Sequence, residues 1–147
     1  MASYYFDTSA LTKLYIQEEG TAVVLDVAEG LAGDRLIILD LTLLESRSAI
    51  RRREREGDIS GSAANQILER IEWDGSSNFL VQPTTSVIEE AARLLDSHPL
   101  RTMDALQLAG CLTIRHSTPP PLTFVCADAR LCAAAAGEGL AILNPLV

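Results

Sequence analysis

Five short apolar runs separated by longer segments of helical periodicity constrain this chain more than any other feature of its sequence. Runs of this length predict β-strands, and strands that alternate with helices predict a parallel sheet covered on both faces. We therefore expect an α/β fold, a three-layer α/β/α sandwich around a central, mostly parallel sheet of about five strands. The expected strands are residues 4–6, 36–39, 79–81, 123–127 and 141–143.

The segments between these runs carry apolar residues at the spacing of amphipathic helices. One of them opens with Thr42 and Glu45, which have the S/T-x-x-E spacing of a capping box. This helix and the next one are predicted to form a helical hairpin, because only a short polar segment separates them. The expected helices are residues 9–15, 21–29, 42–56, 60–73, 86–97, 102–116 and 129–136.

A chain of 147 residues can bury a core without disulfides or a second domain. It shows no internal repeat or linker, so we expect one domain over residues 1–147. Its cysteines, Cys111, Cys126 and Cys132, include no C-x-x-C pair, which favours reduced thiols in a cytoplasmic protein. No signal peptide is recognisable, and no apolar run approaches the roughly 20 residues that span a bilayer, so no membrane association is expected.

The charge of the chain limits its partners. The formal net charge of −8 argues against a protein that coats nucleic acid non-specifically, because binding to phosphates requires a positive surface. One segment departs from this average, since five of the 12 basic residues are arginines between positions 47 and 55. This stripe could hold phosphates. The alternative is a solvated helix end whose positive charge suits the helix dipole.

Four acidic residues, Asp7, Glu45, Asp104 and Asp128, stand where apolar runs give way to helix-start signals. In an open α/β sheet the carboxyl ends of the strands and the helix N-termini face a common crevice, so these residues can meet there. Like charges brought together repel, and a divalent cation is the usual reason that such a cluster persists. The pattern predicts one shared metal site. Taken singly, each acid is equally explained as a helix cap or a first-turn residue.

Four motifs carry these acids in order. They are YFDTSALTKLY at 5–15, LESRSAI at 44–50, LRTMDALQLA at 100–109 and FVCADARL at 124–131, the last continuing to GL at 139–140 and NP at 144–145. Together they resemble the motifs of PIN-domain ribonucleases, especially the VapC-type toxins, and the resemblance spans nearly the whole chain. It implies a PIN-like form of the three-layer sandwich.

The resemblance also implies a function. A member of this family would be a metal-dependent endoribonuclease in which Asp7, Glu45, Asp104 and Asp128 hold one or two Mg²⁺ or Mn²⁺ ions. It would hydrolyse RNA phosphodiesters to a 5′-phosphate and a 3′-hydroxyl. The likeness to VapC further implies the toxin of a VapBC-type toxin–antitoxin system, a homodimer, and a VapB-type antitoxin whose basic tail complements the net charge of −8.

Three further residues accompany the acidic set. Ser9 aligns with a small polar residue of the family that could hydrogen-bond a ligand carboxylate or a metal-bound water. Cys126 stands where the family usually carries Thr or Ser, and because a thiol is a poor hydrogen-bond partner, support of Asp128 is expected to be weaker here. Arg52 shares a helical face with Glu45 about two turns away, which makes it a candidate for contact with an RNA phosphate.

Three other functions fit parts of the same pattern. Cys126 favours a catalytically weakened PIN fold that only binds a partner or RNA. PIN nucleases also serve in RNA processing outside toxin–antitoxin systems. An aspartyl-phosphate phosphatase or a receiver-type domain would use an Asp after the first strand as well, but residues 7–9, DTS, lack the second Asp of the phosphatase D-x-D pattern.

Overall fold

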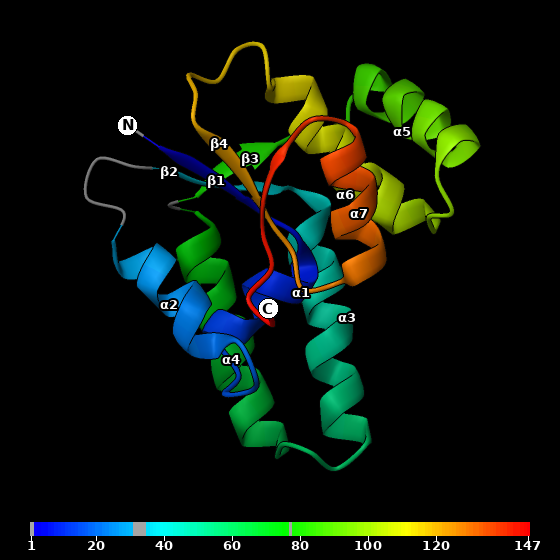
Figure 1. Cartoon of the computed structure of the whole chain (residues 1–147). Coiled ribbons are helices and arrows are strands. Elements are labelled where there is room, and N and C mark those ends of the chain that lie inside the picture. The colour runs from blue at the N-terminus through cyan, green and yellow to red at the C-terminus, as the bar shows by residue number, and fades with distance from the viewer. Residues whose placement is uncertain (1, 31–34, 77) are drawn as a thin grey trace.

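Five parallel strands form a central sheet in the order β3-β2-β1-β4-β5 within the part of the chain that a computed structural model describes, residues 2–30, 35–76 and 78–147 (Figure 1). The strands are β1 Ser3–Phe6, β2 Arg35–Leu39, β3 Phe79–Val81, β4 Leu122–Val125 and β5 Ala141–Leu143. The predicted fold class and the five strand positions are confirmed.

The helices lie between the strands, as predicted. They are α1 Thr8–Leu11, the 3₁₀ turn η1 Thr12–Leu14, α2 Thr21–Glu29, α3 Leu41–Arg55, α4 Gly61–Gly75, α5 Thr85–Ser97, α6 Thr102–Ile114 and α7 Ala129–Gly137. None of the helices in the described segments combines the length and the apolar character that crossing a membrane requires.

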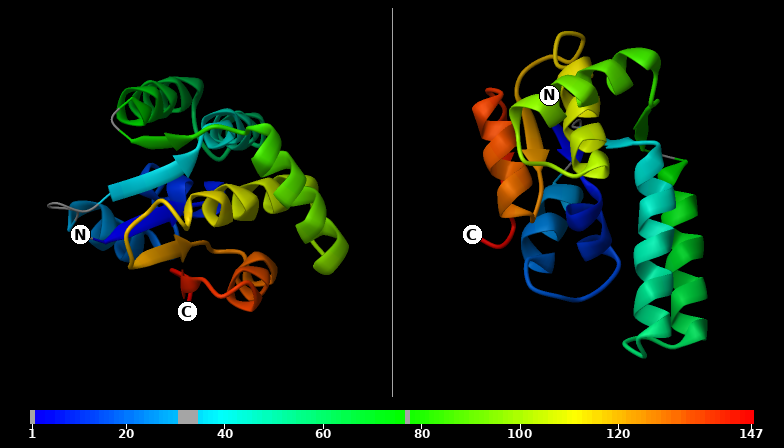
Figure 2. Two further views of the ribbon diagram at one scale, coloured as in Figure 1. Left: turned by 90° about the horizontal axis from the view of Figure 1, so that it is seen from above. Right: turned by 90° about the vertical axis from the view of Figure 1, so that its right-hand side faces the viewer.

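The two faces of the sheet bury separate apolar clusters. Successive side chains of a strand point to opposite faces. Tyr5 and Phe124 therefore pack with α5, α6 and α7 on one face, whereas Phe6 and Val125 pack with α1 and α2 on the other. Each large side chain buried in this way contributes about 1.5–3 kcal/mol. The result is the expected α/β/α arrangement (Figure 2).

Helices α3 and α4 form the predicted hairpin, which projects away from the sheet (Figure 2). They pack through a small cluster of their own that includes Ile50, Leu68 and Ile71. The second helix starts where the sequence predicts, because the Ser60 hydroxyl accepts a hydrogen bond from the Ala63 amide at 3.0 Å and caps α4.

The predicted capping box of Thr42 and Glu45 is wrong. Helix α3 begins at Leu41, so Thr42 lies inside its first turn and is fully buried. Its hydroxyl accepts a hydrogen bond from Gln107 of α6 at 2.7 Å, and Glu45 is bound by Thr8 instead. The predicted helix 9–15 also begins one residue earlier and changes to a 3₁₀ turn after Leu11.

The strand order places a crevice beside β1. The chain adds β2 and β3 on one side of β1 and later returns to add β4 and β5 on the other side. In parallel α/β sheets, the crevice beyond the carboxyl ends of the strands at such a switch point is where ligands bind. Asp7 follows β1 directly and Asp128 follows β4, so the topology brings these two residues to the same crevice.

The contact between β1 and α6 yields a prediction about stability. The Tyr5 hydroxyl is buried without a hydrogen-bond partner among the described residues, and a methyl group at Gly110 would overlap it. We expect Gly110→Ala to lower the free energy of unfolding by about 1–3 kcal/mol in urea titrations, because a packed core resists added volume. In a Tyr5→Phe background, Gly110→Ala should lower the free energy of unfolding much less, because the overlapping hydroxyl is gone. An equal cost in both backgrounds would contradict this account.

Candidate active site

Four acidic side chains from separate segments line one pocket of about 260 Å³. The predicted residues that line it are Asp7, Glu45, Asp104 and Asp128, together with Ser9 and Arg52. As they stand, no three His, Cys, Asp or Glu side chains in the described part of the chain converge closely enough to hold one ion. The fold thus gathers the four carboxylates around one space without forming a ready-made metal cage.

Asp7 is the buried member of the set, with 5% of its surface exposed. Its carboxylate accepts hydrogen bonds from the Ser9 hydroxyl at 2.7 and 2.8 Å, from the Ala10 amide at 2.9 Å and from the Cys126 thiol at 3.2 Å. Burial raises the pKa of Asp7 to about 6, with a smaller contribution from the negative charge of Glu45 and against the effect of these hydrogen bonds. The structure therefore holds a carboxylate where its charge is unfavourable.

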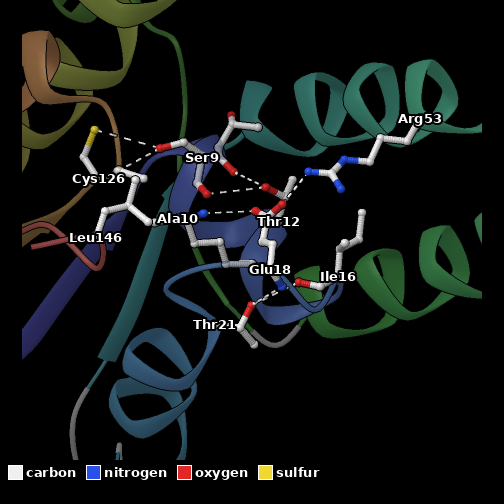
Figure 3. Close-up of polar contacts among 12 residues, drawn as sticks. Ser9, Ala10, Thr12, Ile16, Glu18, Thr21, Arg53, Cys126 and Leu146 are labelled. Carbon is white, nitrogen blue, oxygen red and sulfur yellow. Dashed lines mark hydrogen bonds and ion pairs between the residues drawn. The ribbon is translucent and has the colours of Figure 1, made fainter. Parts of the chain in front are cut away.

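Ser9 connects this carboxylate to the neighbouring strand. Its hydroxyl donates to Asp7 and accepts a hydrogen bond from the Ala127 amide at 3.0 Å. Figure 3 shows Ser9 facing Cys126 across the site. Because Ala127 lies between β4 and α7, this one side chain fixes the position of the segment that carries Asp128 relative to Asp7.

Cys126 also contacts both aspartates. Its sulfur donates to Asp7 and accepts a hydrogen bond from the Asp128 amide at 3.3 Å. Contact with the Cys132 side chain, followed by burial, raises the pKa of the Cys126 thiol, so the group stays protonated and remains a donor. The thiol thus contacts both aspartates through the weaker hydrogen bonds of sulfur.

Glu45 is positioned by residues that the sequence did not single out. The Thr8 hydroxyl donates to its Oε1, and the Gln107 amide nitrogen lies 3.4 Å from the same oxygen. That nitrogen also donates to Thr42 at 2.7 Å and to Thr8 at 3.2 Å. Gln107 is only 2% exposed. A polar residue three positions after Asp104, in an otherwise apolar stretch of α6, is the signal that could have identified it.

Asp104 and Asp128 each cap the helix on which they lie. Asp104 accepts from the Arg101 amide at 3.3 Å, and Asp128 Oδ1 accepts from the amides of Arg130 and Leu131 at 2.9 and 3.1 Å. The explanations weighed for single acids therefore hold for these residues, because Asp7 and Asp128 cap α1 and α7, and Asp104 is an acid in the first turn of α6. These contacts use only part of each carboxylate, and both residues line the pocket.

Arg52 is the only member of the arginine stripe that lines this pocket. Its side chain is exposed and has no hydrogen-bond or ion-pair partner among the residues described. The arginines on either side of it are occupied, since Arg51 pairs with Glu54 at 2.8 Å and Arg53 pairs with Glu18 (Figure 3). The structure thus places Arg52 on the face of α3 that Glu45 occupies, as the helical spacing predicts.

Comparison with known proteins agrees with the motif order. A family model described as the PIN domain matches residues 4–137. The chain belongs to the PIN domain family. Among curated relatives, Ribonuclease VapC45 of Mycobacterium tuberculosis is 29% identical to this PIN protein over 139 residues, which cover 95% of this chain and 93% of the relative.

Solved structures share the fold of this PIN protein. A toxin–antitoxin complex from Klebsiella pneumoniae contains a chain that matches it with a TM-score of 0.68 at 16% identity, covering 97% of each chain. VapC20 from Mycobacterium tuberculosis, described as a sarcin–ricin loop cleaving toxin, matches with a TM-score of 0.68 at 15% identity, covering 97% of this chain and 99% of VapC20. At these identities the likeness shows the fold alone.

The raised pKa of Asp7 predicts a pH dependence of stability. A carboxyl whose pKa is about 4 when unfolded and about 6 when folded stabilises the folded state fully below pH 4, and this stabilisation is lost as the pH rises through 6. The asparagine of Asp7→Asn cannot titrate. In buffer with a chelator, the free energy of unfolding of Asp7→Asn, relative to that of the natural chain, should therefore rise by on the order of 1–3 kcal/mol between pH 4 and pH 7.

The measurement is the free energy of unfolding in urea at several pH values. Asp58→Asn, at an exposed position in the hairpin loop, serves as the control and should track the natural chain. If the difference between Asp7→Asn and the natural chain did not change with pH, the buried carboxylate would not be the group that titrates.

Proposed function

We propose that this chain is an Mg²⁺- or Mn²⁺-dependent endoribonuclease and the toxin of a VapBC-type toxin–antitoxin pair, with residues 1–147 acting as one domain. The observation that carries the proposal is that four acids, distant in sequence, line a single pocket of a PIN fold. In this proposal Asp7, Glu45, Asp104 and Asp128 are the catalytic residues that hold the metal.

The chemistry of the donor set fits such an ion. Carboxylate oxygens are hard ligands of the kind that Mg²⁺ and Mn²⁺ prefer. Burial and the charge of Glu45 oppose ionisation of Asp7, and a nearby cation would remove that penalty. The carboxylates would have to move closer together to share one ion, since no three of them converge among the described residues. Held by these carboxylates, such an ion would lower the pKa of water and offset the charge that develops on the phosphate.

The residues of the chain contribute orientation and charge. Ser9 holds the carboxylate of Asp7, while Thr8 and Gln107 hold that of Glu45. Arg52 is placed to bind a phosphate of the RNA at the edge of the pocket. In the proposed reaction a water oxygen forms a bond to phosphorus as the bond to the 3′-oxygen breaks, which yields a 5′-phosphate and a 3′-hydroxyl. The 2′-hydroxyl takes no part.

Relatives support RNA as the substrate. The similar protein VapC45 is named a ribonuclease, and VapC20, which shares the fold, is described as cleaving the sarcin–ricin loop. The Klebsiella pneumoniae match is described as a toxin–antitoxin complex. We assign the same class of substrate and the toxin role to this chain by similarity.

A protein partner is the second part of the proposal. Helices α3 and α4 expose Leu44 at 67% and Trp73 at 77%, and Leu44 lines a groove of about 340 Å³ with Leu68 and Ile71. An apolar groove of this kind, with an exposed leucine at its edge, suits the binding of another protein. A VapB-type antitoxin could cover this hairpin while its basic tail reaches the acidic pocket, which suits the net charge of −8. We also propose a homodimer.

A weakened PIN fold that binds without cleaving is the competing function. Cys126 is the feature that favours it, because a thiol replaces the hydroxyl expected beside Asp128. The two functions differ in metal binding, since a binding module has no need of the ion.

Loss of one carboxylate tests the catalytic proposal. Asp7→Asn should lower metal-dependent cleavage of RNA at least about 100-fold, because the metal loses its most buried ligand. The variant should stay folded, and Asp58→Asn should keep the activity of the natural chain. Cleavage is followed on labelled RNA with Mn²⁺ and with chelator. Full activity in Asp7→Asn would refute the assignment, and a natural chain that binds no Mn²⁺ in calorimetric titrations would favour the binding module.

The partner proposal has its own test. A small protein with a basic tail, encoded immediately upstream, should copurify with this chain and suppress its cleavage of RNA. Removing the tail should restore cleavage while the complex persists, because the tail fills the pocket and the rest binds the hairpin. Alone, the chain should elute at about twice its mass of 15.9 kDa. A chain that elutes as a monomer would argue against the dimer.

A further inference from the structure

Most lysine and arginine side chains of this acidic protein have a partner within the chain. The sequence has 12 basic and 20 acidic residues, so partners are abundant. Six basic side chains form ion pairs with carboxylates, one donates to a backbone carbonyl and one lies over an aromatic ring. Within the described segments, the arginines whose side chains have no partner are Arg52, Arg55, Arg101 and Arg130. Unpaired arginines are therefore the exception here.

Three of these four arginines surround the candidate active site. Arg52 lines the site pocket, whereas Arg101 and Arg130 line a second hollow of about 580 Å³. The two hollows meet at Asp104 and Asp128, which line both. The second hollow is thus continuous with the site on the side of Asp104 and Asp128, and Arg52 does not reach it.

The charges of the second hollow suit a phosphate a short distance from the carboxylates. Arg101 directly precedes α6, Arg130 lies on α7, and both are exposed, so their planar guanidinium groups are free to bind phosphate oxygens in pairs. Asp104 and Asp128, where the two hollows meet, would repel an anion. Hydrogen bonds from the backbone amides of Arg101, Arg130 and Leu131 to their oxygens offset part of this negative charge. A phosphate in the second hollow can therefore be bound by the two arginines that line it.

We propose that Arg101 and Arg130 bind a backbone phosphate next to the one that is cut, so that the RNA strand leaves the site through the second hollow. This inference rests on the proposed ribonuclease function and adds a direction to it, because Arg52, the other proposed phosphate ligand, lines the site pocket and not the second hollow. A polyanion is the ligand that the observations favour. Both arginines would repel a basic antitoxin tail from the second hollow, so the acidic pocket, which neither arginine lines, is the place for such a tail.

The salt dependence of RNA binding tests this assignment. Asp7→Asn is used so that the RNA stays intact, and a labelled single-stranded RNA of about 12 nucleotides is titrated in chelator at several KCl concentrations. Adding Arg101→Ala and Arg130→Ala should weaken binding about tenfold at low salt. The slope of log K against log salt should become shallower by about 0.7 for each phosphate that the variant no longer neutralises.

A matched control removes the same charge elsewhere. Arg55 and Arg70 line neither hollow, so adding Arg55→Ala and Arg70→Ala should leave the slope unchanged. In the active chain, the Arg101/Arg130 pair of substitutions should raise KM for long RNA and spare kcat, because these side chains do not touch the reacting atoms.

An unchanged slope, or an equal effect of the control pair, would overturn the inference. The proposed function has a separate test, since it would be refuted if the natural chain showed no metal-dependent cleavage of RNA. The binding measurement needs no cleavage, so an arginine-dependent slope would still support an RNA site on a chain that does not cut.

Discussion

Burial of a charged carboxylate at the end of the central strand is the constraint on which the rest of the site depends. Asp7 is almost fully shielded from water, so its negative charge has to be stabilised by hydrogen-bond donors from the protein. Those donors come from α1 and from the residue after β4, and Ser9 binds both segments. The hydrogen bonds that make the buried charge tolerable therefore also fix the relative positions of β1, α1 and the segment that carries Asp128.

The sequence was sufficient for what depends on local periodicity and insufficient for what depends on tertiary contacts. Alternating strands and helices predicted the sheet, and acids after strands predicted a shared pocket. The roles of Thr8 and Gln107 could not be predicted, because their hydrogen bond joins residues 99 positions apart. Thr42 was misinterpreted for the same reason, since a buried contact with α6 replaced the local capping bond that its spacing suggests.

The arginines of the stripe between positions 47 and 55 have different roles, because successive residues of a helix point in different directions. Arg47 and Arg51 bind residues of α4 and the end of α3, and Arg53 reaches Glu18 before α2, so these three hold the hairpin in place. Only Arg52 faces the site. Its spacing from Glu45 was informative because both lie on one regular helix, whereas Arg101 and Arg130 lie on two helices whose proximity the sequence does not reveal.

The residues of the candidate site belong to two parts of the fold, the sheet and the projecting hairpin. Asp7 and Asp128 are anchored to the sheet, whereas Glu45 and Arg52 lie on α3, a rod about 22 Å long that extends well beyond it. Polar contacts link the two parts at the base of the hairpin, where Thr8 and Gln107 bind Glu45 and Gln107 also binds Thr42. Farther out, Glu18 pairs with Arg53. Glu45 lies near the start of α3, shortly after β2 ends at Leu39, so the outer part of the hairpin can differ between related chains without displacing the carboxylates.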